Sequence, residues 1–170
     1  MNPDINKSSR HSKITGDFAE GLVLYMLSKH GFECASIDHT GIDLLARNPS
    51  TKELMGISVK SRSRNLGKEN HHINIPNDNF EKVATACIAF GCNPYFAIVI
   101  DQGATITIFI LSMSTLHRYF PPGKTVSTWK MRDSYLKQYR ADRDIYIIEF
   151  NSQIHNWWIE NSIANEALDG

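Results

Sequence analysis

The sequence is poor in cysteine, and the few cysteines that it has are not arranged for a structural role. Cys34, Cys87 and Cys92 are odd in number and form no C-x-x-C pair, so we expect free thiols rather than a disulfide framework or a zinc site. No apolar run approaches the ~18 residues of a membrane span. The N-terminal stretch MNPDINKSSRHSK lacks the apolar core of a secretory signal. These absences predict no membrane association and a cytoplasmic location.

The chain also lacks a net charge, because 18 basic side chains balance 18 acidic ones. The charges are nevertheless unevenly distributed. No lysine or arginine follows Arg143, whereas five acidic residues do, so residues 1–143 carry 18 basic against 13 acidic side chains, a net charge of +5. The densest basic stretch holds Lys60, Arg62, Arg64 and Lys68. Such a cluster can contact phosphate groups, although a solvated loop has the same composition.

The length of 170 residues predicts one domain. A chain of this size buries roughly 70% of its surface on folding and needs no disulfide or structural metal. We place the core of the domain at about residues 13–111 and a C-terminal extension at about 112–170.

Hydrophobic periodicity predicts an α/β order of elements. A first helix is expected to start with Thr15 as N-cap, to bury a stripe of Phe18, Leu22 and Met26, and to end at His30–Gly31. Residues 62–78 look like a long polar loop, and residues 120–143 have no clear pattern. The remaining expected elements are strands at about 33–37, 42–47, 54–61, 94–100, 105–111 and 145–150, and helices at about 79–90, 112–119 and 153–167.

Three charged residues follow one another in an informative order: Glu20 in the first helix, Asp43 at a strand start, and Lys60 in the strand sequence ISVK. If the turn between the second and third strands centres between Ser50 and Thr51, Asp43 lies opposite Ser58, with Lys60 diagonal to it. Opposite and diagonal side chains of a hairpin are within reach of each other. The spacing therefore predicts that a carboxylate and a lysine meet at one edge of the sheet.

These residue types suit the hydrolysis of a phosphodiester. Asp43 and Glu20 offer the hard oxygen ligands that Mg²⁺ prefers. Lys60 can orient or help deprotonate a water and stabilise charge on phosphate, and Ser58 can at most hold a metal-bound water. Each residue alone also fits an ordinary role: a turn aspartate, a helix-dipole glutamate, an exposed strand lysine. Their order and spacing together favour a site.

The segments GDFAEGLVLYMLSKHGF, TGIDLLA and GISVKSR resemble the PD-(D/E)xK nuclease superfamily. The resemblance covers about residues 13–100 and is nearest to the Holliday-junction-resolvase and RecB-nuclease-like branches. It implies the α/β, restriction-endonuclease-like fold, in which an αβββαβ core forms a central mixed sheet flanked by helices.

By this resemblance Glu20 is the helix glutamate, Asp43 the metal-binding aspartate and Lys60 the catalytic lysine. The chain departs from the family at two positions. Ile42 stands where the family usually has proline, and Ser58 stands where it usually has an acid. Some members with serine at that place carry the acid on the following helix, which makes Glu81 the first candidate for a displaced metal ligand and Glu69 the second.

The resemblance implies a Mg²⁺-dependent DNA endonuclease, with Mn²⁺ as a substitute ion and a homodimer as one option. Arg62, Arg64 and Lys68 are expected to contact DNA phosphates. Because Ser58 removes an acid, a catalytically impaired protein that binds nucleic acid or a protein partner is the alternative. A third interpretation is an interaction subunit that uses the acidic C-terminus with its Trp157–Trp158 pair.

Overall fold

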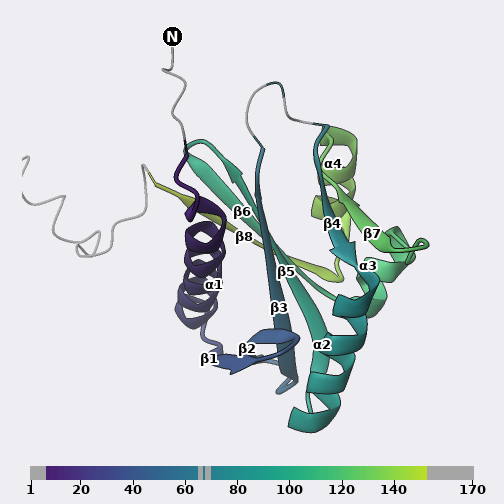
Figure 1. Ribbon diagram of the computed structural model, residues 1–170. Helices are drawn as coiled ribbons and strands as arrows, with labels where there is room; N and C mark the ends of the chain where they lie inside the picture. Colours follow the sequence, from purple (N-terminus) through teal and green to yellow (C-terminus); the bar gives the residue numbers. More distant parts are fainter. Residues whose placement is uncertain (1–6, 65–66, 68–69, 153–170) are drawn as a thin grey trace, which may run out of the picture.

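The computed structural model describes residues 7–64, 67 and 70–152. One helix covers one face of a central sheet, and the other helices, together with a small two-stranded sheet, cover the opposite face (Figure 1). None of the described helices has the length and apolar character that crossing a membrane requires. The elements are α1 (His11–Lys29), β1 (Glu33–His39), β2 (Ile42–Arg47), β3 (Leu54–Ser63), β4 (His72–Pro76), α2 (Asn77–Phe90), β5 (Asn93–Gln102), β6 (Thr105–Ser112), α3 (Met113–Tyr119), β7 (Val126–Lys130), α4 (Asp133–Ala141) and β8 (Ile145–Asn151).

The central sheet has the strand order β1-β2-β3-β5-β6-β8. β3 and β5 run parallel, and the other neighbours run antiparallel. A parallel pair needs a crossover connection, which here contains α2. The predicted α/β class, with a central mixed sheet flanked by helices, is confirmed. β4 is inserted into the expected αβββαβ core order, between β3 and α2.

The predicted long loop at residues 62–78 is wrong, because β4 lies within it and pairs with β7. The two strands form the second sheet, and Ile73 and Ile75 of β4 are buried. The sequence HINIP alternates polar and apolar residues, as a strand with one buried face does. Its partner β7 is separated from it by about fifty residues, so short-range patterns could not reveal the pairing.

The start of α1 differs from the prediction. The helix begins at His11, and Thr15 lies inside it, where its hydroxyl donates to the His11 carbonyl oxygen at 2.7 Å. Phe18 is 55% exposed and does not join the buried stripe. The end of the helix is as predicted: Phe32 N–H donates to Leu27 O and Gly31, with φ 83°, donates to Ser28 O, which is the Schellman motif.

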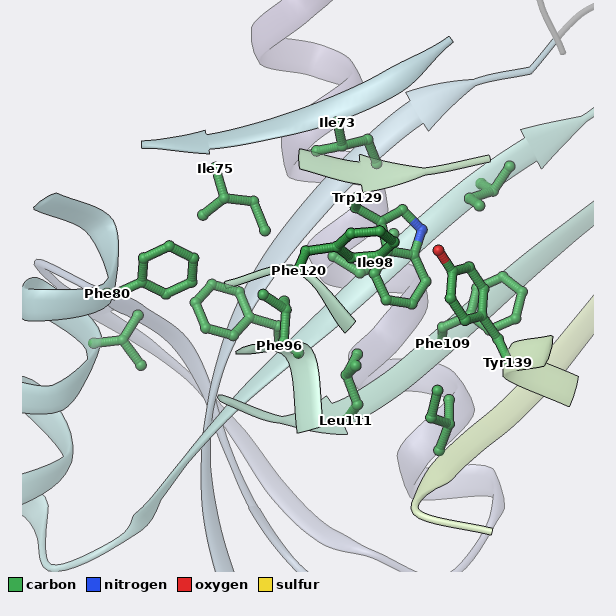
Figure 2. Close-up of a cluster of buried hydrophobic side chains, with 14 of the residues drawn as sticks. Ile73, Ile75, Phe80, Phe96, Ile98, Phe109, Leu111, Phe120, Trp129 and Tyr139 are labelled. Atoms are coloured by element: carbon green, nitrogen blue, oxygen red, sulfur yellow. The ribbon is translucent and has the colours of Figure 1, made fainter. Parts of the chain in front are cut away.

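Two hydrophobic clusters lie on opposite faces of the sheet. The larger cluster packs α2, α3, α4 and the β4–β7 pair against β5 and β6. In its centre the rings of Trp129 and Tyr139 stack with centroids 4.0 Å apart (Figure 2). The smaller cluster packs α1 against β2, β3 and β5. The sheet is thus buried on both faces, and the site residues are found where its strands leave this packing.

Several sequence predictions concern residues outside the part that the structure describes. They are the contact of Lys68 with phosphate, the alternative acid Glu69, the C-terminal helix at 153–167 and the Trp157–Trp158 pair.

Candidate active site

Asp43 lies at the point where β2 and β3 separate. Regular pairing between the two strands runs from Arg47↔Leu54 to Leu44↔Ile57 and goes no further. This register is the one that the sequence predicted for the hairpin, with Asp43 in the position after its last pair. Asp43 Oδ2 instead accepts a hydrogen bond from the backbone N–H of Val59 at 2.7 Å. The carboxylate therefore closes the end of the ladder and leaves its second oxygen for other partners.

The local packing explains this placement. Ile42 lies in the cluster on the α2 side of the sheet, whereas Leu44 lies in the cluster on the α1 side. In a regular strand residues two apart share a face, so the alternation breaks at Asp43. Gly41 supports the break, with φ 109° and a position against the Lys82 carbonyl that leaves no room for a Cβ. The sequence GID thus turns the strand so that the aspartate lies at its edge.

Glu20 of α1 is close enough to Asp43 for the two carboxylates to repel each other. Burial raises the pKa of Glu20 above its ordinary range, and the charges of Asp43 and then Asp17 raise it further. Lys13 and Lys60 oppose this shift. Two carboxylates that repel each other are an arrangement that a bound cation would stabilise.

Lys60 completes the group on β3. Burial lowers the pKa of its ammonium, and the charge of Lys82 lowers it further, while Asp43 and Glu20 raise it. The structure therefore brings Glu20, Asp43 and Lys60 into electrostatic contact from α1, β2 and β3. An ammonium with a lowered pKa releases its proton more readily, which suits a group that assists an attacking water.

Ser58 is buried, with 3% of its surface exposed. It lies two residues before Lys60 and shares its side of β3. Ile57 and Val59 contact the cluster beneath α1, as the alternation predicted. Ser58 is thus a buried hydroxyl on the same side of β3 as Lys60.

The donor set fits Mg²⁺, which is held in many proteins by one or two carboxylates together with water and phosphate oxygens. Asp43 and Glu20 would supply these carboxylates. Among the described residues no three His, Cys, Asp or Glu side chains gather into a metal-binding cluster. An ion here would therefore depend on oxygens from water and substrate for most of its coordination.

Two other predicted site residues are placed less favourably. Glu81 is exposed on α2, and the α2 charge that acts on Lys60 is that of its neighbour Lys82. Arg64 is 9% exposed, and its guanidinium donates to Met131 O at 2.7 Å and pairs with Asp133. Since Nε and one Nη of this guanidinium bind the protein, Arg64 is less suited than Arg62 to contact a phosphate.

Arg62 is exposed, and its side chain lines two polar hollows. One, of about 520 Å³, extends from Lys60 along the start of β4, and the other, of about 370 Å³, extends to the start of α1. Sequence reasoning missed three basic residues here and beside Lys60: Lys7, His11 and Lys82. Lys7 and His11 precede Thr15, where the sequence predicts the first helix to begin, and the position of Lys82 depends on how α2 crosses the sheet.

The sequence matches no protein-family model, and no curated protein is detectably similar to it. The structure, in contrast, is similar to Hjc of Archaeoglobus fulgidus, a Holliday junction resolvase from an archaeal hyperthermophile. The TM-score is 0.53 at 19% sequence identity, over 72% of this chain and 93% of the resolvase. At this identity the likeness concerns the fold, and it agrees with the resemblance seen in the sequence. The chain thus shares the fold of this Holliday junction resolvase.

Proposed function

We propose that the protein is a divalent-metal-dependent DNA endonuclease. The observation that carries the proposal is that Glu20, Asp43 and Lys60 converge at the edge of a nuclease-type sheet. The charges of Asp43 and Lys60 shift the pKa of Glu20, and the charges of Asp43 and Glu20 shift the pKa of Lys60. Asp43 and Glu20 would hold Mg²⁺, or Mn²⁺ in its place. The ion would supply a Lewis acid for the phosphate and lower the pKa of a bound water.

The protein groups have separate tasks in this proposal. The Val59 N–H holds Asp43 in place through one oxygen. Lys60 takes part in removing a proton from the attacking water, because burial favours its neutral form. Arg62 meets the backbone phosphates beside the site. In the overall step, water forms a new P–O bond, one ester P–O bond breaks, and the leaving oxygen receives a proton.

Asp43→Asn tests the proposal more cleanly than Asp43→Ala. The amide oxygen of asparagine still accepts the Val59 N–H, whereas alanine leaves that group without its partner, at a cost of about 1–3 kcal/mol. We expect Asp43→Asn to lower the rate of DNA cleavage at least ~100-fold, with an unchanged circular dichroism spectrum. Plasmid, junction and single-stranded DNA are incubated with Mg²⁺ or Mn²⁺, and the products are separated on gels.

Metal binding is measured independently of DNA cleavage, as the rise in the melting temperature of the protein on adding Mg²⁺. A ligand at 100 times its dissociation constant stabilises the folded state by about 2.7 kcal/mol. Asp43→Asn should abolish most of this rise, and Glu33→Gln, at the exposed far end of β1, should retain it. Cleavage by Asp43→Asn at the wild-type rate would show that the site is misassigned.

The buried Ser58 favours a second function, a nuclease-fold protein that binds DNA without cutting it. Ser58→Glu separates the two functions, with Ser58→Gln as the neutral control of similar size. For an active enzyme we expect Ser58→Glu to increase the Mg²⁺-dependent rise in melting temperature and to keep cleavage. DNA binding without cleavage, by the wild type and by Ser58→Glu alike, would support the binding protein.

Glu81 remains the proposed source of a displaced acid and is tested in the same assay. If it holds metal, Glu81→Gln reduces cleavage and the Mg²⁺-dependent stabilisation as Asp43→Asn does. If it is an exposed glutamate of the first turns of α2, both stay at the wild-type level.

A further inference from the structure

Two polar hollows adjoin each other at Ser61, Arg62 and His71, which line both of them, and one of the two also reaches Lys60. We call them together the β3 trough. Its floor is the end of β3, one wall is the start of β4, and the other wall is the start of α1. These three segments lie at the same end of the molecule (Figure 1). The trough thus begins at the candidate active site and leads away from it.

The lining of the β3 trough is cationic and polar. Lys7, His11, Lys60, Arg62 and His71 contribute basic groups, and serines, Thr15 and asparagines contribute neutral hydrogen-bonding groups. No acidic residue and no Phe, Tyr or Trp is among the described residues that line it. Lysine, arginine and small polar side chains are the groups that usually contact phosphate oxygens and sugars.

Arg62 is available for such a contact. It is exposed, and within the described part of the chain its guanidinium has no hydrogen bond or ion pair to another residue. Arg64, two residues later, differs because the protein itself occupies its fork. The strand thus presents one free arginine to the trough and uses the next one to hold the fold together.

We propose that the β3 trough holds the sugar–phosphate backbone of the DNA strand that leads away from the candidate metal site, and that it contacts the strand without distinguishing bases. This inference rests on the proposed function for its substrate. Phosphate contacts fix the position of a nucleic acid but carry no sequence information. Bases stack mainly on Phe, Tyr and Trp side chains, and the described lining holds none of these, its rings being those of His11, His71 and His72.

The test measures the affinity for DNA in the absence of metal, so that cleavage plays no part. Fluorescence anisotropy follows the binding of two labelled DNAs of unrelated sequence and the same form, over a range of salt concentrations. The variants are Arg62→Gln, Lys7→Gln and their combination. Lys29→Gln is the control, because it removes one positive charge at the opposite end of α1.

We expect Arg62→Gln and Lys7→Gln each to weaken binding several-fold, equally for both sequences. Each should lower the slope of log affinity against log salt by about 1, the value for one lost phosphate contact. The combination should lower the slope by about 2, and Lys29→Gln should behave as the wild type. Wild-type affinity in Arg62→Gln and Lys7→Gln would overturn the trough, as would losses that differ between the two sequences.

This experiment can fail independently of the proposed function. A protein that cuts DNA while Arg62→Gln binds normally is a nuclease without the β3 trough. A protein that loses affinity as expected but never cuts keeps the trough and is not a nuclease. A wild type that binds no DNA overturns the trough directly.

Discussion

At the scale of the residue, the ionised carboxylate of Glu20 lowers the free energy of unfolding, and this effect can be tested by substitution. Folding raises the pKa of Glu20, chiefly through burial and then through Asp43, so the folded state disfavours its ionised form. This unfavourable contribution is present at pH values above the ordinary glutamate range. It vanishes at acid pH, where the group is protonated in both states.

We therefore expect Glu20→Gln to raise the melting temperature at pH 7 by at most a few degrees. The gain should disappear as the pH falls below the ordinary glutamate pKa of 4.5. The Mg²⁺-dependent rise in melting temperature should decrease in the same variant, because a ligand has been lost. Glu33→Gln, an exposed strand glutamate, is the control for charge removal. A lower melting temperature for Glu20→Gln at pH 7 would contradict the repulsion inferred here.

The sequence predicted the surroundings of some residues better than those of others. The pairing of β2 with β3 followed from the turn residues, because a hairpin register depends on local geometry. The environment of Arg64 did not, because its partners Met131 and Asp133 are almost seventy residues away. In the sequence Arg64 lies among other basic residues, which favours a phosphate contact. Its acceptors, the Met131 carbonyl and the Asp133 carboxylate, are evident only from the fold.

At the scale of the element, Arg64 joins the end of β3 to the start of α4. Its N–H groups donate to the Met131 carbonyl and the Asp133 carboxylate, and its backbone N–H donates to Asp101 O at 2.7 Å. The arginine fork has a fixed geometry that lysine cannot reproduce. The contact thus attaches the layer that contains α4 to the central sheet.

We expect Arg64→Lys and Arg64→Gln each to cost about 1–3 kcal/mol of stability, because a carbonyl in a largely buried region loses its donor. Arg62→Gln is the matched control, an exposed arginine on the same strand, and should stay within about 0.5 kcal/mol of the wild type. Urea denaturation followed by circular dichroism measures these differences. Full stability of Arg64→Lys would show that the charge alone is sufficient.

Elements with a long regular pattern were predicted well, and the others were not. β2 was predicted with its observed bounds, and α2, β5, β6 and α3 were placed within about two residues. β4, β7 and α4 were missed or left unassigned, since they are short and become stable only by packing on one another and on the sheet. Such elements depend on tertiary contacts more than on local propensity.

At the scale of the whole molecule, the sheet connects the two hydrophobic clusters. β5 contributes Phe96 and Ile98 to the cluster on the α2 side and Ala97 and Val99 to the cluster on the α1 side. A strand that is shared in this way cannot lose one cluster and keep the other intact. We therefore expect the described core to unfold as one cooperative unit, as the prediction of a single domain requires.

Leu27→Ala and Leu116→Ala test this cooperativity from the two faces. Leu27 on α1 and Leu116 on α3 are almost fully buried in different clusters. Each substitution should cost about 2–5 kcal/mol, and because the sites are distant the two costs should add. Far-UV and near-UV circular dichroism should report the same midpoint in urea for every variant. Two separate transitions would instead show that the faces fold independently.

The sequence by itself determined the class of fold and the order of the candidate site residues. Helix and strand periods, the Schellman end of α1 and the turn after β2 are all encoded within short segments, and so is the order of Glu20, Asp43 and Lys60. The tertiary structure alone decided which charged groups meet. It placed Lys82 beside Lys60, occupied Arg64 with Asp133, and brought the start of α1 to the end of β3. These contacts join residues far apart in the chain, and only the packing of the whole sheet sets the distances between them.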